Sequence, residues 1–151
     1  MEPAGPADAV RPLAPRPAGA RGEGEREFMW VVTRYAFYSV VCARSQDGAR
    51  ADTTSLMVRA RARNHLTTLQ GRFRELADHS IRETPDTDYR YRIIVPKARW
   101  KEVVAQMVEE LSYGNFKDEA ARSLGFGERD YIHALHDVWN RLYDLQRQKQ
   151  Q

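Results

Sequence analysis

Two segments of this chain alternate between apolar and charged residues, the pattern of a strand with one buried and one exposed face. In residues 56–63, one face carries Val58, Ala60 and Ala62, and the other carries Arg59, Arg61 and Arg63. In residues 89–95, one face carries Tyr89, Tyr91, Ile93 and Val95, and the other carries Arg90, Arg92 and Ile94. The stretch between them, residues 65–77, has apolar residues at helical spacing, so the chain belongs to the α+β class.

Further elements are predicted on both sides of this segment. The predicted strands are 29–33, 37–43, 56–63, 80–84 and 89–95; the predicted helices are 65–77, 100–111, 116–124 and 128–145. The first two strands form a hairpin, and the polar residues 44–54 form a loop. Asn64 and Asn115 are predicted to cap the helices that follow them. The buried face of the last helix is predicted to contain Tyr131, Leu135, Val138, Leu142 and Leu145.

The order of these elements predicts a sheet topology. Residues 56–111 have the order βαββα, a ferredoxin-like unit that lacks its last strand. Strand 37–43 can fill that place from the N-terminal side, which makes the unit a permuted one. It then pairs antiparallel with strand 56–63, and strand 89–95 lies on the other side of 56–63. The prediction is an antiparallel sheet of four or five strands with extra C-terminal helices.

The chain of 151 residues divides by composition at residue 28. Residues 1–28 hold five of the seven prolines and few large apolar residues, as is typical of a disordered Pro/Gly/Ala-rich tail. An alternative is that translation begins at Met29 and that these 28 residues are an incorrectly assigned start. Residues 29–151 are predicted to be one domain.

The sequence shows no recognisable secretory signal and no membrane-spanning segment. The first 28 residues lack the apolar segment of a secretory signal, and no apolar run approaches the ~18 residues of a membrane span. The only cysteine, Cys42, permits no internal disulfide and is predicted to be a buried structural residue. We therefore expect a cytoplasmic protein that does not enter the membrane.

Several stretches are similar to one protein family. They are Met29-Trp30, Thr33–Val41, Met57–Arg61, Asp88–Arg92, Val95–Lys97, Asn115–Lys117 and Leu135–Trp139. Across residues 29 to about 146, the chain resembles a family of small uncharacterised bacterial proteins. The resemblance implies a domain that begins at Met29, and it implies no activity and no catalytic residue.

The strongest candidate site is a sheet face lined with arginine. The predicted alternation places five guanidinium groups on one face, those of Arg59, Arg61, Arg63, Arg90 and Arg92. Guanidinium groups bind phosphate in a bidentate manner and keep their charge, and an open sheet face is a platform for single-stranded RNA. Tyr89 and Tyr91 are predicted to lie on the opposite face, and Tyr38 is a candidate aromatic contributor.

Two alternatives treat these arginines as structural. In the first, the face is solvated and its arginines pair with acids such as Glu83. In the second, a C-terminal helix covers the face and its carboxylates pair with the arginines. The pI near 9.2 is only weak support for a polyanion partner, because coding bias also enriches arginine.

No catalytic or metal-binding constellation stands out. His133 and His136 lie at i and i+3 on a predicted helix, near Asp130 and Asp137, and are weak metal candidates. The spacing alone is not specific, so we predict no metal, no cofactor and no catalytic residue.

The predicted function is that of a small non-catalytic module that binds RNA, single-stranded DNA or another polyanion. One alternative is a protein-interaction or regulatory module that acts through its C-terminal helices. Another is a small hydrolase or nuclease without a recognisable motif. Trp30 lies near a predicted edge strand, so a homodimer is expected through sheet extension or through the last helix.

Overall fold

The computed structural model describes residues 28–124 and 128–149, and this part of the chain forms a five-stranded sheet with four α-helices. In chain order the elements are β1 (Phe28–Val32), β2 (Phe37–Arg44), β3 (Ala51–Ala60), α1 (Arg63–Arg72), the 3₁₀ helix η1 (Arg74–Leu76), β4 (Arg82–Glu83), β5 (Tyr91–Pro96), α2 (Lys97–Glu109), α3 (Phe116–Leu124) and α4 (Arg129–Gln148). The α+β class is confirmed.

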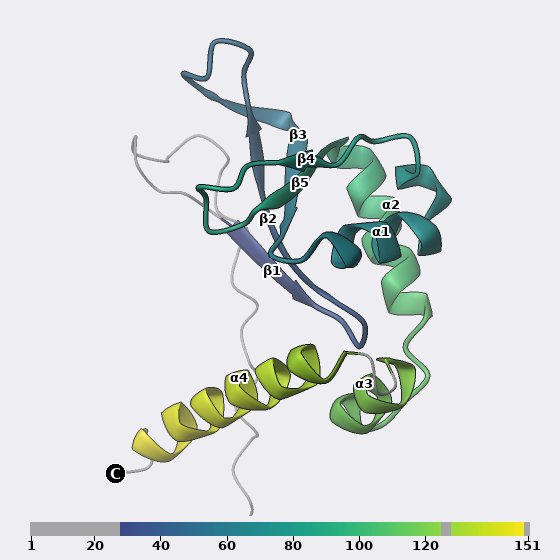
Figure 1. Ribbon diagram of the computed structural model, residues 1–151, viewed down its shortest axis with the longest axis vertical. Coiled ribbons are helices and arrows are strands. Elements are labelled where there is room, and N and C mark those ends of the chain that lie inside the picture. Colours follow the sequence, from purple (N-terminus) through teal and green to yellow (C-terminus); the bar gives the residue numbers. More distant parts are fainter. Residues whose placement is uncertain (1–27, 125–127, 150–151) are drawn as a thin grey trace, which may run out of the picture.

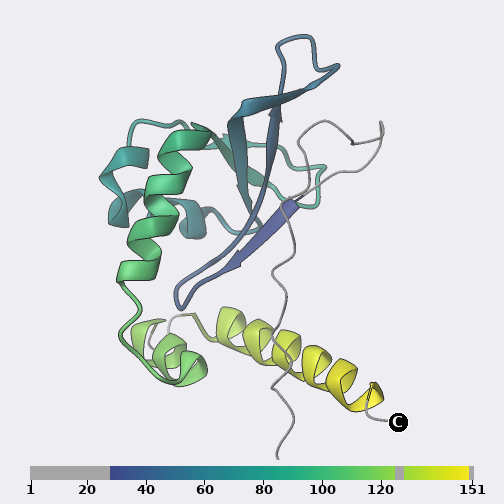
Figure 2. The ribbon, with the colours of Figure 1, turned by 180° about the vertical axis from the view of Figure 1, so that it is seen from behind.

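The strands are ordered β1-β2-β3-β5-β4, and every neighbouring pair is antiparallel. The predicted hairpin is confirmed, and so is the pairing of β3 with β2 on one side and β5 on the other. Helices α1 and α2 cover one face of this sheet (Figures 1 and 2). Val58, Ile93 and Val95 face these helices and are fully buried against the apolar side chains of both. The opposite face of the sheet is called the outer face below.

The boundaries of β3 differ from the prediction at both ends. The strand begins at Ala51, inside the segment predicted as a loop. The connection between β2 and β3 is only the tight turn at residues 45–50, so pairing of the two strands resumes at Ala51. Gly48 there has a φ of 71°, a conformation that favours glycine. The strand ends at Ala60, and Arg63 is the first residue of α1 rather than the last of β3. Alanine is found in both strands and helices, so the alternation that continues through Ala60 and Ala62 does not show where β3 ends and α1 begins.

Helix capping follows the prediction at one site and departs from it at another. Asn115 Oδ1 accepts hydrogen bonds from the backbone N–H groups of Lys117 and Asp118 at 3.1 and 3.3 Å, which confirms the cap of α3. The N-cap of α1 is Ala62, whose side chain makes no capping bond. Asn64 instead donates a hydrogen bond from Nδ2 to Glu128 Oε1 at 2.6 Å.

The last helix is less buried than its apolar periodicity indicated. Of the predicted face only Tyr131 and Leu135 are buried, whereas Val138, Leu142 and Leu145 are exposed. Figure 1 shows α4 running away from α1 and α2, with its first turns near α3. The prediction of a fully buried face was wrong because periodicity identifies a shared face, not the neighbour that covers it.

Two predictions fall outside the described residues. They are the tail at residues 1–27 and the segment 125–127 between the predicted helices 116–124 and 128–145. Phe28, assigned above to the tail, is the first residue of β1. Within the described ranges, no helix is long and apolar enough to cross a membrane.

Candidate nucleic-acid interface

One row of side chains crosses the whole outer face, with one residue from each strand. The strand register pairs Trp30 with Ser39, Ser39 with Arg59, Arg59 with Arg92, and Arg92 with Arg82. Directly opposed residues of antiparallel strands point to the same side of the sheet. These five residues, called the outer row below, therefore place three guanidinium groups and one indole on a single line.

The structure brings together only part of the predicted arginine set. Arg59 and Arg92 belong to the outer row, and Arg61 follows β3 on the same side. Arg63 leaves the face because it begins α1. Arg90 precedes β5 and forms a salt bridge with Glu83 at 2.6 Å, which agrees with the structural alternative for that one residue.

Tyr89 lies on the opposite side from the one predicted. Because β5 begins at Tyr91, the alternation of the strand does not extend to Tyr89. Its ring is buried on the outer face, where the guanidinium carbons of Arg59 and Arg61 lie 4.7 and 4.2 Å from the ring centroid. Such cation–π contacts hold a guanidinium in place without neutralising its charge.

Arg59 and Arg92 are each oriented by hydrogen bonds. Arg59 Nη2 donates to Oγ of Ser39, a fully buried neighbour in the outer row, at 2.7 Å. Arg92 Nη2 donates to Thr87 Oγ1 at 2.7 Å and to the Tyr89 carbonyl at 2.8 Å. These two partners of Arg92 are neutral groups of the loop before β5, so the hydrogen bonds attach that loop to the outer face.

The aromatic side chains of the outer face come from β1 and β2. The ring centroids of Phe28 and Trp30 are 5.7 Å apart, and those of Trp30 and Phe37 are 5.6 Å apart. Trp30 is 58% exposed, and Phe28 is similarly open. Tyr38, the candidate named from the sequence, instead points into the core, where its hydroxyl donates to the His65 carbonyl at 2.9 Å.

The salt bridges of the described residues leave several arginines of the outer face without a carboxylate partner. The arginine salt bridges join Arg34 and Arg122 to Glu119, Arg72 to Glu110, and Arg90 to Glu83. Within residues 28–124 and 128–149, Arg61, Arg82 and Arg92 form no salt bridge. The described residues therefore supply no carboxylate partner that would neutralise these three charges.

Sequence reasoning missed Arg82, Ser39 and the contribution of Trp30. β4 has only two residues, too few for a periodic pattern, so Arg82 was not assigned a face. These residues can be identified only from the register of strand pairing, because each lies directly opposite a residue of the neighbouring strand.

Side-chain contacts join the β1–β2 turn and α1 to the C-terminal helices. The Tyr131 hydroxyl on α4 donates a hydrogen bond to the Thr33 carbonyl at 2.9 Å. The ring centroids of Tyr131 and His65 are 5.0 Å apart. Burial raises the pKa of Tyr131 and lowers the pKa of His65. Hydrogen bonds from Arg122 and Arg34 hold the pKa of Glu119 below its usual range.

The other candidate residues have ordinary surroundings. His133 and His136 are exposed on α4, and the described ranges hold no group of three or more His, Cys, Asp or Glu side chains suited to a metal ion. Cys42 packs against the core but is only partly buried, less than predicted.

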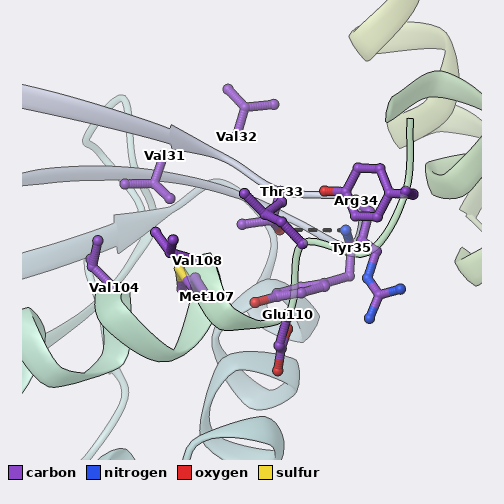
Figure 3. Close-up of a pocket in the computed structure, with 11 residues that line it drawn as sticks. Val31, Val32, Thr33, Arg34, Tyr35, Val104, Met107, Val108 and Glu110 are labelled. Atoms are coloured by element: carbon purple, nitrogen blue, oxygen red, sulfur yellow. Dashed lines mark hydrogen bonds between the residues drawn. The ribbon is translucent and has the colours of Figure 1, made fainter. Parts of the chain in front are cut away.

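A shallow groove lies on the other side of β1 from the outer face. Figure 3 shows Val31 of β1 opposite Val104 and Val108 of α2, with Arg34 and Glu110 toward one end. The groove encloses about 200 Å³, below the range of roughly 300–1,000 Å³ that is typical of small-molecule sites. It therefore does not compete with the outer face as a candidate site.

No protein-family model, curated protein or solved structure matches the chain. The resemblance to a family of small bacterial proteins stays a prediction, and the functional argument depends on the geometry of the outer face.

Proposed function

We propose that this protein binds single-stranded nucleic acid, RNA in the first instance, on the outer face of its sheet. The observation that carries the proposal is the outer row, which crosses all five strands with Arg82, Arg92 and Arg59 at one end and Trp30 at the other. Phosphate groups bind the arginine end, and bases stack at the aromatic end.

The arginine end suits a polyanion because its charges lie on neighbouring strands. Strands are spaced about 4.8 Å apart, so the three guanidinium groups of the outer row extend over roughly 10 Å of backbone. Hydrogen bonds already hold Arg59 and Arg92 in place, so these two side chains lose less conformational freedom at the moment of binding. Arg61 lies beside the row, with its guanidinium group against the Tyr89 ring.

The aromatic end suits unpaired bases. Every base has a π-face, so stacking on a side chain such as Trp30 contributes about 1–3 kcal/mol per base without requiring a particular sequence. In a duplex the bases are already stacked on each other and are not free to do this. The combination of exposed rings and arginines therefore favours single strands.

The proposal extends to the fold and to the location of the protein. The segment β3–α1–β4–β5–α2, with β2 beside β3, has the strand order of a ferredoxin-like unit whose last strand comes from the N-terminal side. A cytoplasmic location, where single-stranded RNA is accessible, is part of the same proposal.

Fluorescence anisotropy with labelled single-stranded RNA, single-stranded DNA and duplex tests the proposal. The full chain is expected to bind single strands more tightly than duplex at low salt. Trp30→Ala is expected to weaken binding by about 1–3 kcal/mol, the value of one lost stacking contact. Leu111→Ala, at a residue that is 60% exposed on another surface, is the control and is expected to leave binding unchanged.

Two results would refute this function. One is the absence of binding to every nucleic acid at low salt. The other is an equal effect of Trp30→Ala and Leu111→Ala. Hydrolysis of the probe during the titration would instead support the alternative of a small nuclease, for which the described residues supply no metal cluster.

A further inference from the structure

One edge of the sheet is open in the described part of the chain. There β1 pairs with β2 along one side only, and its five residues, FMWVV, include no charge and no proline. Phe28, Met29, Trp30 and Val32 are each between 40% and 59% exposed. An exposed, uncharged edge strand is a template for pairing with a further strand, and most proteins protect such edges.

The opposite edge of the sheet shows that protection. β4 has only two residues, Arg82 and Glu83, and both are charged and exposed. A short, charged edge strand is a poor template for another strand. The two edges therefore differ in kind, and β1 is the edge that can accept a further strand.

The hydrogen bonds of the β1–β2 hairpin show which backbone groups of β1 face outward. The Thr33 N–H group donates to the Ala36 carbonyl at 2.9 Å, so these two residues form a hydrogen-bonded pair. Bonded and unbonded pairs alternate along antiparallel strands. The N–H and C=O groups of Val32, Trp30 and Phe28 therefore point away from β2, toward the open edge.

The far end of the sheet gives the same result independently. The Thr84 N–H group donates to the Arg90 carbonyl at 2.7 Å, so Arg82 and Arg92, two residues further along each strand, are also a hydrogen-bonded pair. Each strand residue directs its backbone groups to one neighbour only, so bonded and unbonded pairs alternate along the outer row. The last pair, at Trp30, is an unbonded one, which again directs the backbone groups of Trp30 outward.

The outward-facing residues of β1 are symmetric about Trp30, so the strand is complementary to its own copy. In an antiparallel pair with a two-fold axis at Trp30, this residue lies opposite itself and Phe28 lies opposite Val32. Each of the three resulting pairs exchanges two backbone hydrogen bonds, so every outward group of both strands has a partner. Any other register leaves outward groups of β1 without a partner in the second β1.

The side chains of the outer face match in this register. Trp30 meets Trp30 of the second copy, and Phe28 meets Val32. Aromatic pairs and pairs of an aromatic with a β-branched side chain are favourable across antiparallel strands, by roughly 0.2–1 kcal/mol each. The ends of β1 thus add no charge or clash of polarity to the pairing.

The helix side of the edge is apolar as well. Met29 of the second copy lies opposite Val31, at the open side of the shallow groove between β1 and α2 (Figure 3). Val104 and Val108 line the other wall of that groove, and Val108 is exposed. Pairing of the two strands therefore brings an apolar side chain beside an apolar groove.

We infer that β1 pairs antiparallel with β1 of a second copy of this chain, in register about Trp30, to form one continuous ten-stranded sheet. The contact is isologous and closes on itself, as a two-fold dimer requires. It involves five strand residues on each side, against roughly 20–30 in a standard interface, so a dissociation constant in the micromolar range is expected.

This pairing joins the outer faces of the two copies. The two-fold axis is perpendicular to the sheet, so both outer rows lie on the same side and form one line with the two Trp30 rings at its centre. Pairing uses the backbone edge and leaves one face of each ring open. Where this line serves as a shared platform for one nucleic-acid strand, the inference rests on the proposed function.

Sedimentation velocity of the full chain without nucleic acid tests the pairing. The unmodified protein is expected to shift from monomer to dimer over the micromolar range. Trp30→Lys places two like charges directly opposite each other and is expected to weaken the dimer at least tenfold. Leu142→Lys, at a residue that is 62% exposed on α4, is the matched control and is expected to leave the dimer unchanged. Circular dichroism checks that both variants are folded.

Disulfide cross-linking tests the register separately and keeps Trp30. Phe28→Cys and Val32→Cys are made in chains that also carry Cys42→Ala. Opposed residues of a hydrogen-bonded pair have Cα atoms about 5.5 Å apart, within the range of a disulfide. The two variants are expected to cross-link when mixed and oxidised. Neither is expected to cross-link alone, because each cysteine is then about 13 Å along the strand from its own copy.

Three results would overturn the inference. They are a monomer at about 100 µM, an equal effect of Trp30→Lys and Leu142→Lys, and the absence of a cross-link in the mixture. These experiments contain no nucleic acid, so they separate the inference from the proposed function. A dimer that binds no nucleic acid refutes the function alone, and a monomer that binds it refutes the pairing alone.

Discussion

Arg82→Gln is the substitution that isolates the charge of the outer row from its structural role. Arg82 is exposed at the far end of the row on β4, and its guanidinium makes no hydrogen bond or salt bridge with the described residues. Its loss is therefore expected to change the free energy of unfolding by no more than about 0.5 kcal/mol. Any effect on binding then reports the ligand contact alone.

The magnitude follows from the number of arginines in the row. For single strands, the slope of log affinity against log salt is about −0.7 for each neutralised phosphate. Three guanidinium groups, those of Arg59, Arg92 and Arg82, give a slope of about −2. The variant keeps two of them and is expected to show a slope of about −1.4. Between about 50 and 200 mM salt, affinity then falls about 18-fold for the unmodified chain and about 7-fold for the variant.

The assay is an anisotropy titration of labelled single-stranded RNA at four salt concentrations. Arg74→Gln, at an exposed arginine in η1, is the matched control and is expected to keep the slope of the unmodified chain. The reasoning is refuted if Arg82→Gln leaves the slope unchanged, or if Arg74→Gln lowers it equally. Thermal unfolding of both variants checks that neither has lost its fold.

Three further predictions concern stability. Arg59→Ala removes a hydrogen bond to the buried Ser39 and is expected to lower the free energy of unfolding by about 1.5–3 kcal/mol in urea denaturation. Burial lowers the pKa of His65, so the unfolded chain binds the proton more readily and stability falls as pH drops below about 6.5; His65→Gln should show a smaller difference in Tm between pH 7.5 and 5.5. Hydrogen bonds from Arg122 and Arg34 lower the pKa of Glu119, so its contribution is complete above about pH 4.5 and is lost at lower pH; acid titration of Glu119→Gln by circular dichroism should lack this component.

Alternation and pairing rules were sufficient to predict the sheet. The apolar positions of β2, β3 and β5 identify their buried faces, and the short β1–β2 connection forces a hairpin. With the hairpin and the buried faces fixed, few orders of the strands in the sheet remain possible. These features are local or follow directly from connectivity.

The candidate site was predicted most reliably where a residue lies inside a strand. Arg59 and Arg92 do, and both were assigned to the face on which they are found. Arg63 and Tyr89 lie just beyond strand ends, where the period of two no longer fixes direction. Tyr89 reaches the outer face because its loop folds back and its carbonyl binds Arg92.

The exposed half of α4 illustrates a different limit. Its spacing correctly grouped Val138, Leu142 and Leu145 on one face, but the protein supplies no described neighbour to cover them. Periodicity is a property of one helix, whereas burial also depends on what packs against it.

Mapping of the binding surface by NMR is the most direct test of the nucleic-acid interface. A ¹⁵N-labelled full chain is titrated with a short single-stranded RNA, and backbone and indole N–H shifts are followed. The largest changes are expected at Trp30, Arg59, Arg92 and Arg82, with little change along α1 and α2. Changes centred on those two helices, or no change at all at low salt, would contradict the account.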